Sequence, residues 1–225
     1  MSSTEYPIVC RFEGMSARDL AGYEAHRTRK NGDLGHVDRK RSHMNRRLIG
    51  QSDWARTAME EIRTMAMETY AAELETLEQR CDRKRLDLRL AEGPKDPWRA
   101  SRHGPLREVI LTANKEWFED AGSSDVLFDE KAKDRKERVF EERAVSWLLK
   151  SFGDDVIHAR ADLDEEAYHI HAVIMPRATV QKFGTECRVL QPSIHPFIKD
   201  YEKAQDDLGS WFSEVGLVRG ERRKV

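Results

Sequence analysis

The chain has 225 residues, of which 36% are charged, and its formal net charge at pH 7 is -2. This length allows one sizeable hydrophobic core or two small ones. The charged fraction exceeds the roughly 25% of ordinary globular domains, and solvated helix surfaces explain the excess most simply. The near-neutral net charge excludes a protein that is basic throughout, so any nucleic-acid contact must come from a local patch.

Cysteine usage and hydropathy favour a cytoplasmic location. Cys10, Cys81 and Cys187 are odd in number and include no CxxC pair, which is typical of a reducing compartment. The N-terminal residues show no signal-peptide pattern, and no run approaches the roughly 18 apolar residues of a membrane span. We therefore expect a soluble protein with no membrane partner.

The first half of the chain predicts one strand and two helices. Residues 6–12 form a β-rich run, and Ser16 is placed to cap a helix over 17–30. Residues 53–91 contain no Gly or Pro and are rich in Ala, Glu, Leu and Met, which predicts one long helix. The Gly- and Pro-containing segment 93–105 ends it.

The second half predicts three strands and two helices. A strand over 106–113 precedes a charged helix over about 129–152. Strands at 155–162 and 168–175 are separated by a short connection, so we expect an antiparallel hairpin. An amphipathic helix over 193–217 and a basic tail close the chain.

The segment DLDEEAYHIHAVIMP places His169 and His171 in an otherwise apolar strand. Residues i and i+2 of a strand share a face, so both imidazoles point to one side of the sheet. Asp162 ends the partner strand, and Glu165 or Glu166 lies in the connecting turn. Asp162, His169 and His171 would leave open positions on a catalytic metal. The alternative is a pair of core histidines bonded to backbone groups beside solvated acids.

A second informative segment, residues 26–48, is strongly basic. From residue 27 to 48 it carries eight basic residues against Asp33 and Asp38, a local net charge of +6, with His36 and His43 in addition. Interleaved Ser42 and Asn45 make the segment suited to phosphate contacts. A solvated charged loop is the alternative on charge alone.

Together the two segments resemble the Mob/Pre plasmid mobilisation relaxases of the MobV class. The first family motif, approximately H-x-x-R and then D-x-x-R-S-H-x-N, stands here as residues 26–29 (HRTR) and 38–45 (DRKRSHMN). The metal motif, approximately H-x-D-E-x-x-P-H-x-H, stands here as residues 162–171 (DLDEEAYHIH). The resemblance covers most of the chain outside residues 53–91.

The resemblance implies a metal-dependent, site- and strand-specific single-strand DNA nickase that remains linked to the 5′ end and frees a 3′ hydroxyl. Carried over, His26 is the nucleophile, with Glu165 and Arg29 as further catalytic residues. Asp162, His169 and His171 are the metal ligands. A neutral imidazole is abundant at pH 7 and a metal can stabilise charge on phosphoryl oxygens, so the chemistry agrees. Arg29, one turn from His26 on the expected helix, can contact a phosphate oxygen.

The sequence departs from the family pattern at three positions. Asp162 replaces a histidine ligand, and its hard oxygen favours Mn²⁺ or Mg²⁺ over zinc; weakened metal binding in a protein that only binds DNA is the alternative. Tyr168 replaces the proline before the two histidines. Arg46 stands where many members carry a tyrosine, which excludes that nucleophile and leaves Tyr23 as the rival to His26. His158, on the Asp162 face by parity, is a fallback ligand.

The resemblance also implies partners. Origin-of-transfer DNA, as a hairpin plus a single strand, is the substrate, and a coupling protein of the conjugation machinery is a further candidate. The expected DNA-binding residues are Arg27, Lys30, Arg41, Ser42, Asn45, Arg46, Arg99 and Arg102, the last two matching an arginine pair ahead of the central strand.

The expected fold is α+β, with an antiparallel relaxase-type (HUH) sheet, helices packing on one face, and a long helix inserted after the first motif. Residues 1–225 form one relaxase domain. The 53–91 helix is either a packing helix, the simpler interpretation, or an arm that grips an origin hairpin. Two other classes of protein are the alternatives to a relaxase. A DNA-binding module without catalysis would bind DNA independently of metal. A metal-dependent hydrolase of small phosphoesters would have no use for the basic segment.

Overall fold

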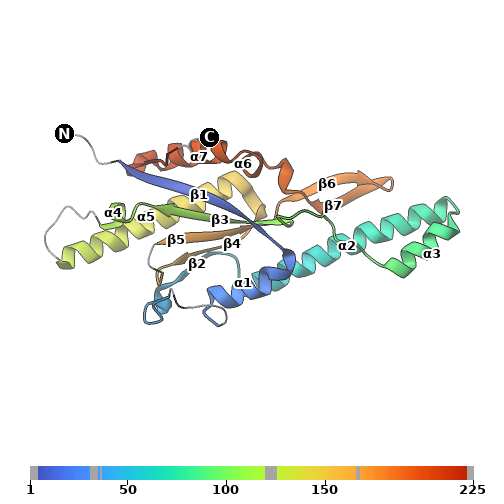
Figure 1. Ribbon diagram of the computed structural model, residues 1–225, viewed down its shortest axis with the longest axis horizontal. Coiled ribbons are helices and arrows are strands. Elements are labelled where there is room, and N and C mark those ends of the chain that lie inside the picture. Colours follow the sequence, from blue (N-terminus) through green and yellow to red (C-terminus); the bar gives the residue numbers. More distant parts are fainter. Residues whose placement is uncertain (1–4, 31–34, 36, 120–125, 166–167, 222–225) are drawn as a thin grey trace.

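The computed structural model describes residues 5–30, 35, 37–119, 126–165 and 168–221, with only the main chain described over 126–131. Six strands form one sheet in the order β2-β4-β5-β3-β1-β8, and β6 pairs with β7 in a separate hairpin (Figure 1). All pairs in the large sheet are antiparallel except β1 with β8. The strands are β1 (Tyr6–Met15), β2 (Arg46–Ile49), β3 (Leu106–Ala113), β4 (Val156–Asp162), β5 (His169–Ile174), β6 (Arg177–Lys182), β7 (Thr185–Leu190) and β8 (Leu217–Arg219).

Helices cover both faces of the large sheet (Figure 1). On one face α5 (Val126–Phe152) and α7 (Tyr201–Phe212) bury Phe140, Trp147 and Phe212 against apolar residues of β4 and β5. On the other face α1 (Leu20–Arg27) and α2 (Trp54–Gln79) pack on Val173 and on Met175 just beyond β5. The expectation of helices on one face is therefore wrong. The smaller helices are α3 (Arg83–Glu92), α4 (Lys115–Glu119) and α6 (Pro196–Lys199), with short 3-10 turns at Ala17–Asp19, Ser42–Met44, Gly153–Asp155, Pro192–Ile194 and Ser213–Val215.

Strand β5 is central, with β4 on one side and β3 on the other. The predicted antiparallel hairpin is confirmed, since His169 lies opposite Asp162 and His171 lies opposite Arg160. On the other edge of β5, His169 and His171 face Thr112 and Ile110 of β3. Alternation along the strand places both imidazoles on one face, as predicted. Packing of Val173 shows that this face is the one covered by α1 and α2.

The segment expected to be one helix over 53–91 is two helices. Helix α2 ends at Gln79, and Cys81 takes a positive φ of 53° in the turn that follows. Asp82 then accepts a hydrogen bond from the amide of Arg85 and caps α3. The first half of α2 packs on the sheet, while its far end extends beyond the sheet and contacts β7, and α3 folds back against α2 (Figure 1). The segment is thus a packing helix in one half and a projecting arm in the other.

The first helix ends sooner than predicted. Ser16 caps a 3-10 turn that runs into α1, and α1 stops at Arg27 because Arg29 adopts a left-handed φ of 59°. The amides of Arg29 and Lys30 donate to the carbonyls of His26 and Ala25, the pattern of a Schellman motif in which glycine is the usual left-handed residue. Arg29 therefore lies beyond the helix, not one turn along it from His26.

The C-terminal region also differs from one continuous helix. Pro196 and Asp200 interrupt it: Asp200 caps the start of α7, and the chain after α7 returns as β8 to pair in parallel with β1. Among the described residues, no helix combines the length and apolar character that crossing a bilayer requires.

Candidate metal centre

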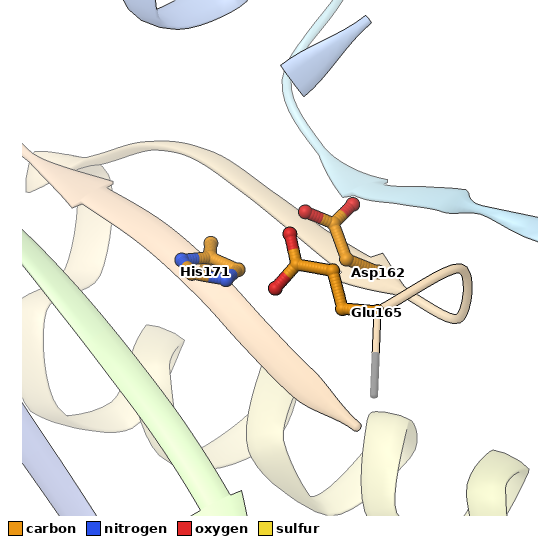
Figure 2. A group of neighbouring side chains, drawn as sticks. All are labelled: Asp162, Glu165 and His171. Carbon is orange, nitrogen blue, oxygen red and sulfur yellow. The ribbon is translucent and has the colours of Figure 1, made fainter. Parts of the chain in front are cut away.

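Three side chains converge where β4 and β5 meet. Asp162 ends β4, Glu165 lies in the turn that follows it, and His171 comes from β5 (Figure 2). One potential ligand atom from each residue lies within 4.8 Å of the other two. Two carboxylate oxygens and one imidazole nitrogen are a donor set that suits Mn²⁺ or Mg²⁺. We call Asp162, Glu165 and His171 the metal-ligand group.

The ring of His171 is oriented by a neighbouring strand. Its Nδ1 lies 2.8 Å from Oε1 of Glu108 on β3, and its Nε2 is buried without a hydrogen-bond partner among the described residues. A carboxylate behind an imidazole fixes the ring and tautomer of a metal ligand. Burial raises the pKa of Glu108, but the contacts with His171 and Arg27 outweigh burial and hold that pKa below its ordinary value. Glu108 is therefore an ionised support for His171.

His169 lies beside this group. Its ring centroid is 5.8 Å from that of His171, and its Nδ1 is buried with no hydrogen-bond partner in the described part of the chain. Burial, and next the charge of His171, lower the pKa of His169. The ring is thus neutral and available, although Glu165 takes the place in the group that the sequence assigned to His169.

Guanidinium groups surround the carboxylates of the group. Arg27 from α1 donates to Asp162 at 2.9 Å and to Glu165 at 3.1 Å, and Arg160 donates to the other oxygen of Asp162 at 2.6 Å. Arg29 donates to Glu165 at 3.1 Å. These cations offset the repulsion between buried carboxylates, which would otherwise be costly.

The turn that carries Glu165 is held by the basic segment. Asn45 Oδ1 accepts from the amides of Leu163 and Asp164 at 2.7 and 3.2 Å, and Ser42 Oγ donates to Asp164 at 2.6 Å. Burial opposes ionisation of Asp164, but the bonds from Arg29, Ser42 and Asn45 hold the pKa of its carboxyl well below the ordinary range. Ser42 and Asn45, expected to contact DNA, thus bond to the turn of the protein itself.

Two further predicted residues, Arg46 and His158, are partly and fully buried, respectively. Arg46 forms ion pairs with Glu137 and Glu141 of α5 at 3.2 and 2.7 Å, and Tyr168 donates to Glu141 at 2.6 Å. His158, the fallback ligand, is fully buried and stacks on Trp54 with 4.4 Å between ring centroids. Burial, and next the charges of Arg47 and Arg160, lower the pKa of His158 to about 3.

The remaining predicted DNA contacts lie in different places. Arg41 lines a small recess of about 90 Å³ that also contains Glu165, Lys115 and Lys133, so it reaches the neighbourhood of the metal-ligand group. Lys30 is exposed just beyond α1. Arg99 and Arg102 lie in the loop that precedes β3, and the recesses they line contain no member of the group. Glu166 and His36 lie outside the described residues.

The two nucleophile candidates share α1. His26 immediately precedes Arg27, whose guanidinium reaches the metal-ligand group. The hydroxyl of Tyr23 donates to Glu108 at 2.9 Å. Burial first, and then the charge of Glu108, raise the pKa of Tyr23 well above its ordinary value, which opposes formation of a phenolate.

Sequence reasoning did not identify Glu108, Tyr23 as a partner of Glu108, or Arg160 as a support of Asp162. The one available signal was Glu108 itself, an acidic residue within the apolar run LREVILTA. A buried acid in such a strand needs a partner, and its partners are His171, Arg27 and Tyr23.

The residues present suit a divalent cation. A buried imidazole nitrogen with no hydrogen-bond partner in the described part of the chain lies near two carboxylate oxygens, and an outer carboxylate supports the imidazole. Asp162, Glu165 and His171 are the residues that would hold it, with His169 adjacent.

The sheet with two histidines on its central strand defines an α+β relaxase-type fold, and solved structures share it. The chain is similar to the MobM relaxase domain (MOBV; Mob_Pre) bound to plasmid pMV158 oriT DNA in a Mn-bound crystal structure at pH 6.8, with 21% identity, coverage of 97% of this chain and 95% of that chain, and a TM-score of 0.60. A second Mn-bound structure of that domain with oriT DNA, at pH 4.6, gives 21% identity, 97% and 96% coverage, and a TM-score of 0.59. No protein-family model matches the sequence, and comparison with curated proteins gives no match. The predicted fold is therefore confirmed: the chain has the fold of the MobM relaxase domain.

Proposed function

We propose that this protein is a metal-dependent DNA relaxase, which nicks one strand of a plasmid or mobile-element transfer origin and stays linked to the 5′ end for conjugative mobilisation. The metal-ligand group carries the proposal, because it lies beside the central strand of a fold shared with a relaxase domain bound to oriT DNA. The Mn-bound state of that domain favours a divalent cation here, Mn²⁺ or Mg²⁺.

The protein side of the chemistry consists of binding and charge. When bound at Asp162, Glu165 and His171, a divalent cation supplies Lewis-acid stabilisation of a phosphoryl oxygen. Glu108 keeps the Nε2 of His171 directed to that position by accepting from Nδ1. Arg41, in the recess beside Glu165, is placed to contact a phosphate oxygen of the bound strand.

His26 is the proposed nucleophile. One ring nitrogen of His26 forms a bond to the phosphorus, and the bond from phosphorus to the 3′ oxygen breaks. The other ring nitrogen releases its proton, and the 3′ oxygen gains one through solvent to become the free 3′ hydroxyl. The 5′ strand is left as a phosphoramidate of the histidine. Tyr23 is the weaker candidate because its raised pKa keeps the phenol protonated.

Arg27 and Arg29 connect the proposed nucleophile to the metal-ligand group. Both guanidinium groups contact Glu165 at 3.1 Å in the structure. Arriving phosphate oxygens and a divalent cation change the local charge balance, and these arginines can then turn from carboxylate to phosphate. Arg29 thereby takes its expected role as a phosphate contact from its left-handed position.

Incubation of the protein with single-stranded DNA from the element that carries its gene, with and without Mn²⁺, tests the proposal. The expected result is a single nick and a covalent adduct that form only with the metal. Binding of hairpin DNA without any cleavage would favour the second candidate, a catalytically weakened origin-binding protein, which the substitution of Asp162 for a histidine ligand supports. A coupling protein of the conjugation machinery is the further partner we expect.

A further inference from the structure

A recess of about 570 Å³ lies between the loop 98–105 and the β6–β7 hairpin, apart from the metal-ligand group. Its lining includes Arg99, His103, Arg107 and Lys182 and contains no acidic side chain among the described residues. The whole chain has 41 acidic and 39 basic residues, so a surface of this size lined only by basic and neutral groups departs from the average. Such a lining favours an anionic ligand.

The cations of the recess carry uncompensated charge. Arg99, Arg107 and Lys182 form no ion pair within the described part of the chain, whereas arginines at the metal-ligand group pair with carboxylates. Arg107 instead donates through Nη1 to backbone carbonyls of His103 and Gly104, both at 3.0 Å. Those bonds hold the guanidinium at the wall of the recess and leave its charge available to a ligand.

The walls of the recess are fixed before any ligand binds. The amide of Leu190 on β7 donates to the carbonyl of Pro97 at 2.9 Å. The loop also crosses the end of β1 so closely that a Cβ on Gly104 would lie 2.3 Å from the Met15 carbonyl oxygen, and one on Gly14 would lie 2.4 Å from that of His103. A preformed wall lowers the entropic cost of binding.

The neutral lining identifies the kind of anion. Trp98 lines the recess while part of its side chain packs on the core, and Ser101, Gln191 and Ser193 add hydrogen-bonding groups. Cations that track phosphates beside an aromatic ring on which a base can stack are the composition of single-strand nucleic-acid grooves. Hydroxyl and amide groups commonly complete the phosphate contacts.

We propose that this recess, the loop–hairpin groove, binds the backbone of single-stranded DNA as a second contact outside the nicking centre. The proposal rests on the proposed function, because the strand it holds is the one that the relaxase nicks. Its contacts are to phosphate and a base face, so they are independent of the origin sequence.

Binding of oligothymidylate over a series of salt concentrations tests the groove. The double variant Arg99→Gln/Lys182→Gln should lower the slope of log affinity against log salt by about 1.4, since each lost single-strand phosphate contact removes about 0.7. The matched control is Lys199→Gln/Lys203→Gln, which makes the same charge change at exposed positions on α6 and α7 and should leave the slope unchanged. A duplex oligonucleotide serves as the second probe.

The groove proposal would be overturned by an unchanged slope of log affinity against log salt in the Arg99/Lys182 variant, or by an equal fall of that slope in the control. A loss seen with the duplex and not with the single strand would also overturn it. Nicking of origin DNA is measured on the same proteins and separates the two proposals. If the groove variant weakens binding but no protein nicks DNA, only the relaxase assignment is wrong. If nicking depends on metal but the slope is unchanged in the groove variant, only the groove proposal is wrong.

Discussion

Arg27 donates a 2.9 Å hydrogen bond to the carboxylate of Asp162, at the oxygen-rich side of the candidate metal centre. The same guanidinium nitrogen lies 3.1 Å from Glu165. One cationic side chain thus contacts two of the three residues that could hold a divalent cation. A metal and Arg27 therefore compete for the same negative charge.

Arg27→Gln should tighten Mn²⁺ binding. Removing a positive charge that touches two ligand residues strengthens the attraction of the site for a cation, and we expect an affinity gain of about tenfold, roughly 1.4 kcal/mol. Isothermal titration calorimetry without DNA measures it. Arg47→Gln is the control. It removes the same positive charge from a residue that pairs with Glu24 and not with the metal-ligand group. Weaker binding in Arg27→Gln would mean that Arg27 organises the site more than it competes for it.

The histidines of β5 should contribute unequally to metal binding. His171→Ala removes a member of the metal-ligand group and should abolish both Mn²⁺ binding and nicking, while His169→Ala should retain measurable Mn²⁺ affinity.

Glu108→Gln should weaken Mn²⁺ binding about 10- to 100-fold through loss of the support for His171. His43→Ala, at an exposed histidine, is the control. Near wild-type nicking by His171→Ala with Mn²⁺ present would refute the assignment.

Two arginines of the basic segment should have separable effects. Arg41→Gln should flatten the salt dependence of DNA binding by about one phosphate contact, because Arg41 lines the recess beside Glu165. Arg46→Gln should instead lower the free energy of unfolding by about 3 kcal/mol, since it removes the cation that pairs with the buried acids Glu137 and Glu141 of α5. Urea unfolding and salt-dependent binding of both variants give the test. A stable Arg46→Gln with a reduced salt slope would return Arg46 to the DNA interface.

Sequence patterns predicted the elements whose signal is local. The run of β-branched and apolar residues at 106–113 coincides with β3, and the strands flanking the turn at 162–169 are correct within one residue. Four strands were missed. The β6–β7 hairpin is a local feature, turning at Phe183 and Gly184, which both take a positive φ. The other two have weak local signals: β2 begins with two arginines, and β8 has three residues. They are strands because β4 and β1 offer open edges to pair with, and pairing over long sequence separation has no signature in a short window.

The candidate site contains the ligand types that the sequence predicts, but several contacts around it differ from the expected ones. The spacing of Asp162 and His171 across a hairpin placed both correctly on one face. The charge of the basic segment predicts a phosphate surface, yet Ser42, Asn45 and Arg46 bond to the protein itself. Charge density alone does not distinguish a cation that meets DNA from one that meets a buried carboxylate, because the carboxylate is brought in by tertiary packing.

His158 should make the protein less stable in mild acid. Its folded pKa of about 3 lies below the unfolded value near 6.5, so the unfolded state binds the extra proton between these pH values. The contribution of neutral His158 to the free energy of unfolding is therefore present above about pH 6.5. It falls as the pH decreases, by about 2 kcal/mol between pH 7 and pH 5. His158→Gln should lose this part of the pH dependence. Urea unfolding of both proteins at the two pH values measures the difference, and equal pH dependence would contradict a neutral buried His158.

The identity of the nucleophile follows from the different states of two side chains on α1. The hydroxyl of Tyr23 donates a hydrogen bond to Glu108 in a buried position that raises the pKa of Tyr23, so a phenolate forms only at a high energetic cost. Histidine is neutral at pH 7 by its ordinary pKa. His26→Ala should therefore give no covalent protein–DNA adduct with Mn²⁺ present, while Tyr23→Phe should still give one.

The chemistry of the adduct provides an independent measurement. A phosphoramidate is cleaved by acid, whereas a phosphotyrosine ester survives brief acid treatment, so acid should release DNA from the wild-type adduct formed through His26. Mass spectrometry of the digested adduct before acid treatment should place the nucleotide on the peptide that contains residue 26. Tyr23→Phe also tests the support of Glu108, since it removes one hydrogen bond to that carboxylate, and its adduct should form more slowly and remain acid-labile. An acid-stable adduct that persists in His26→Ala and disappears in Tyr23→Phe would assign the reaction to tyrosine.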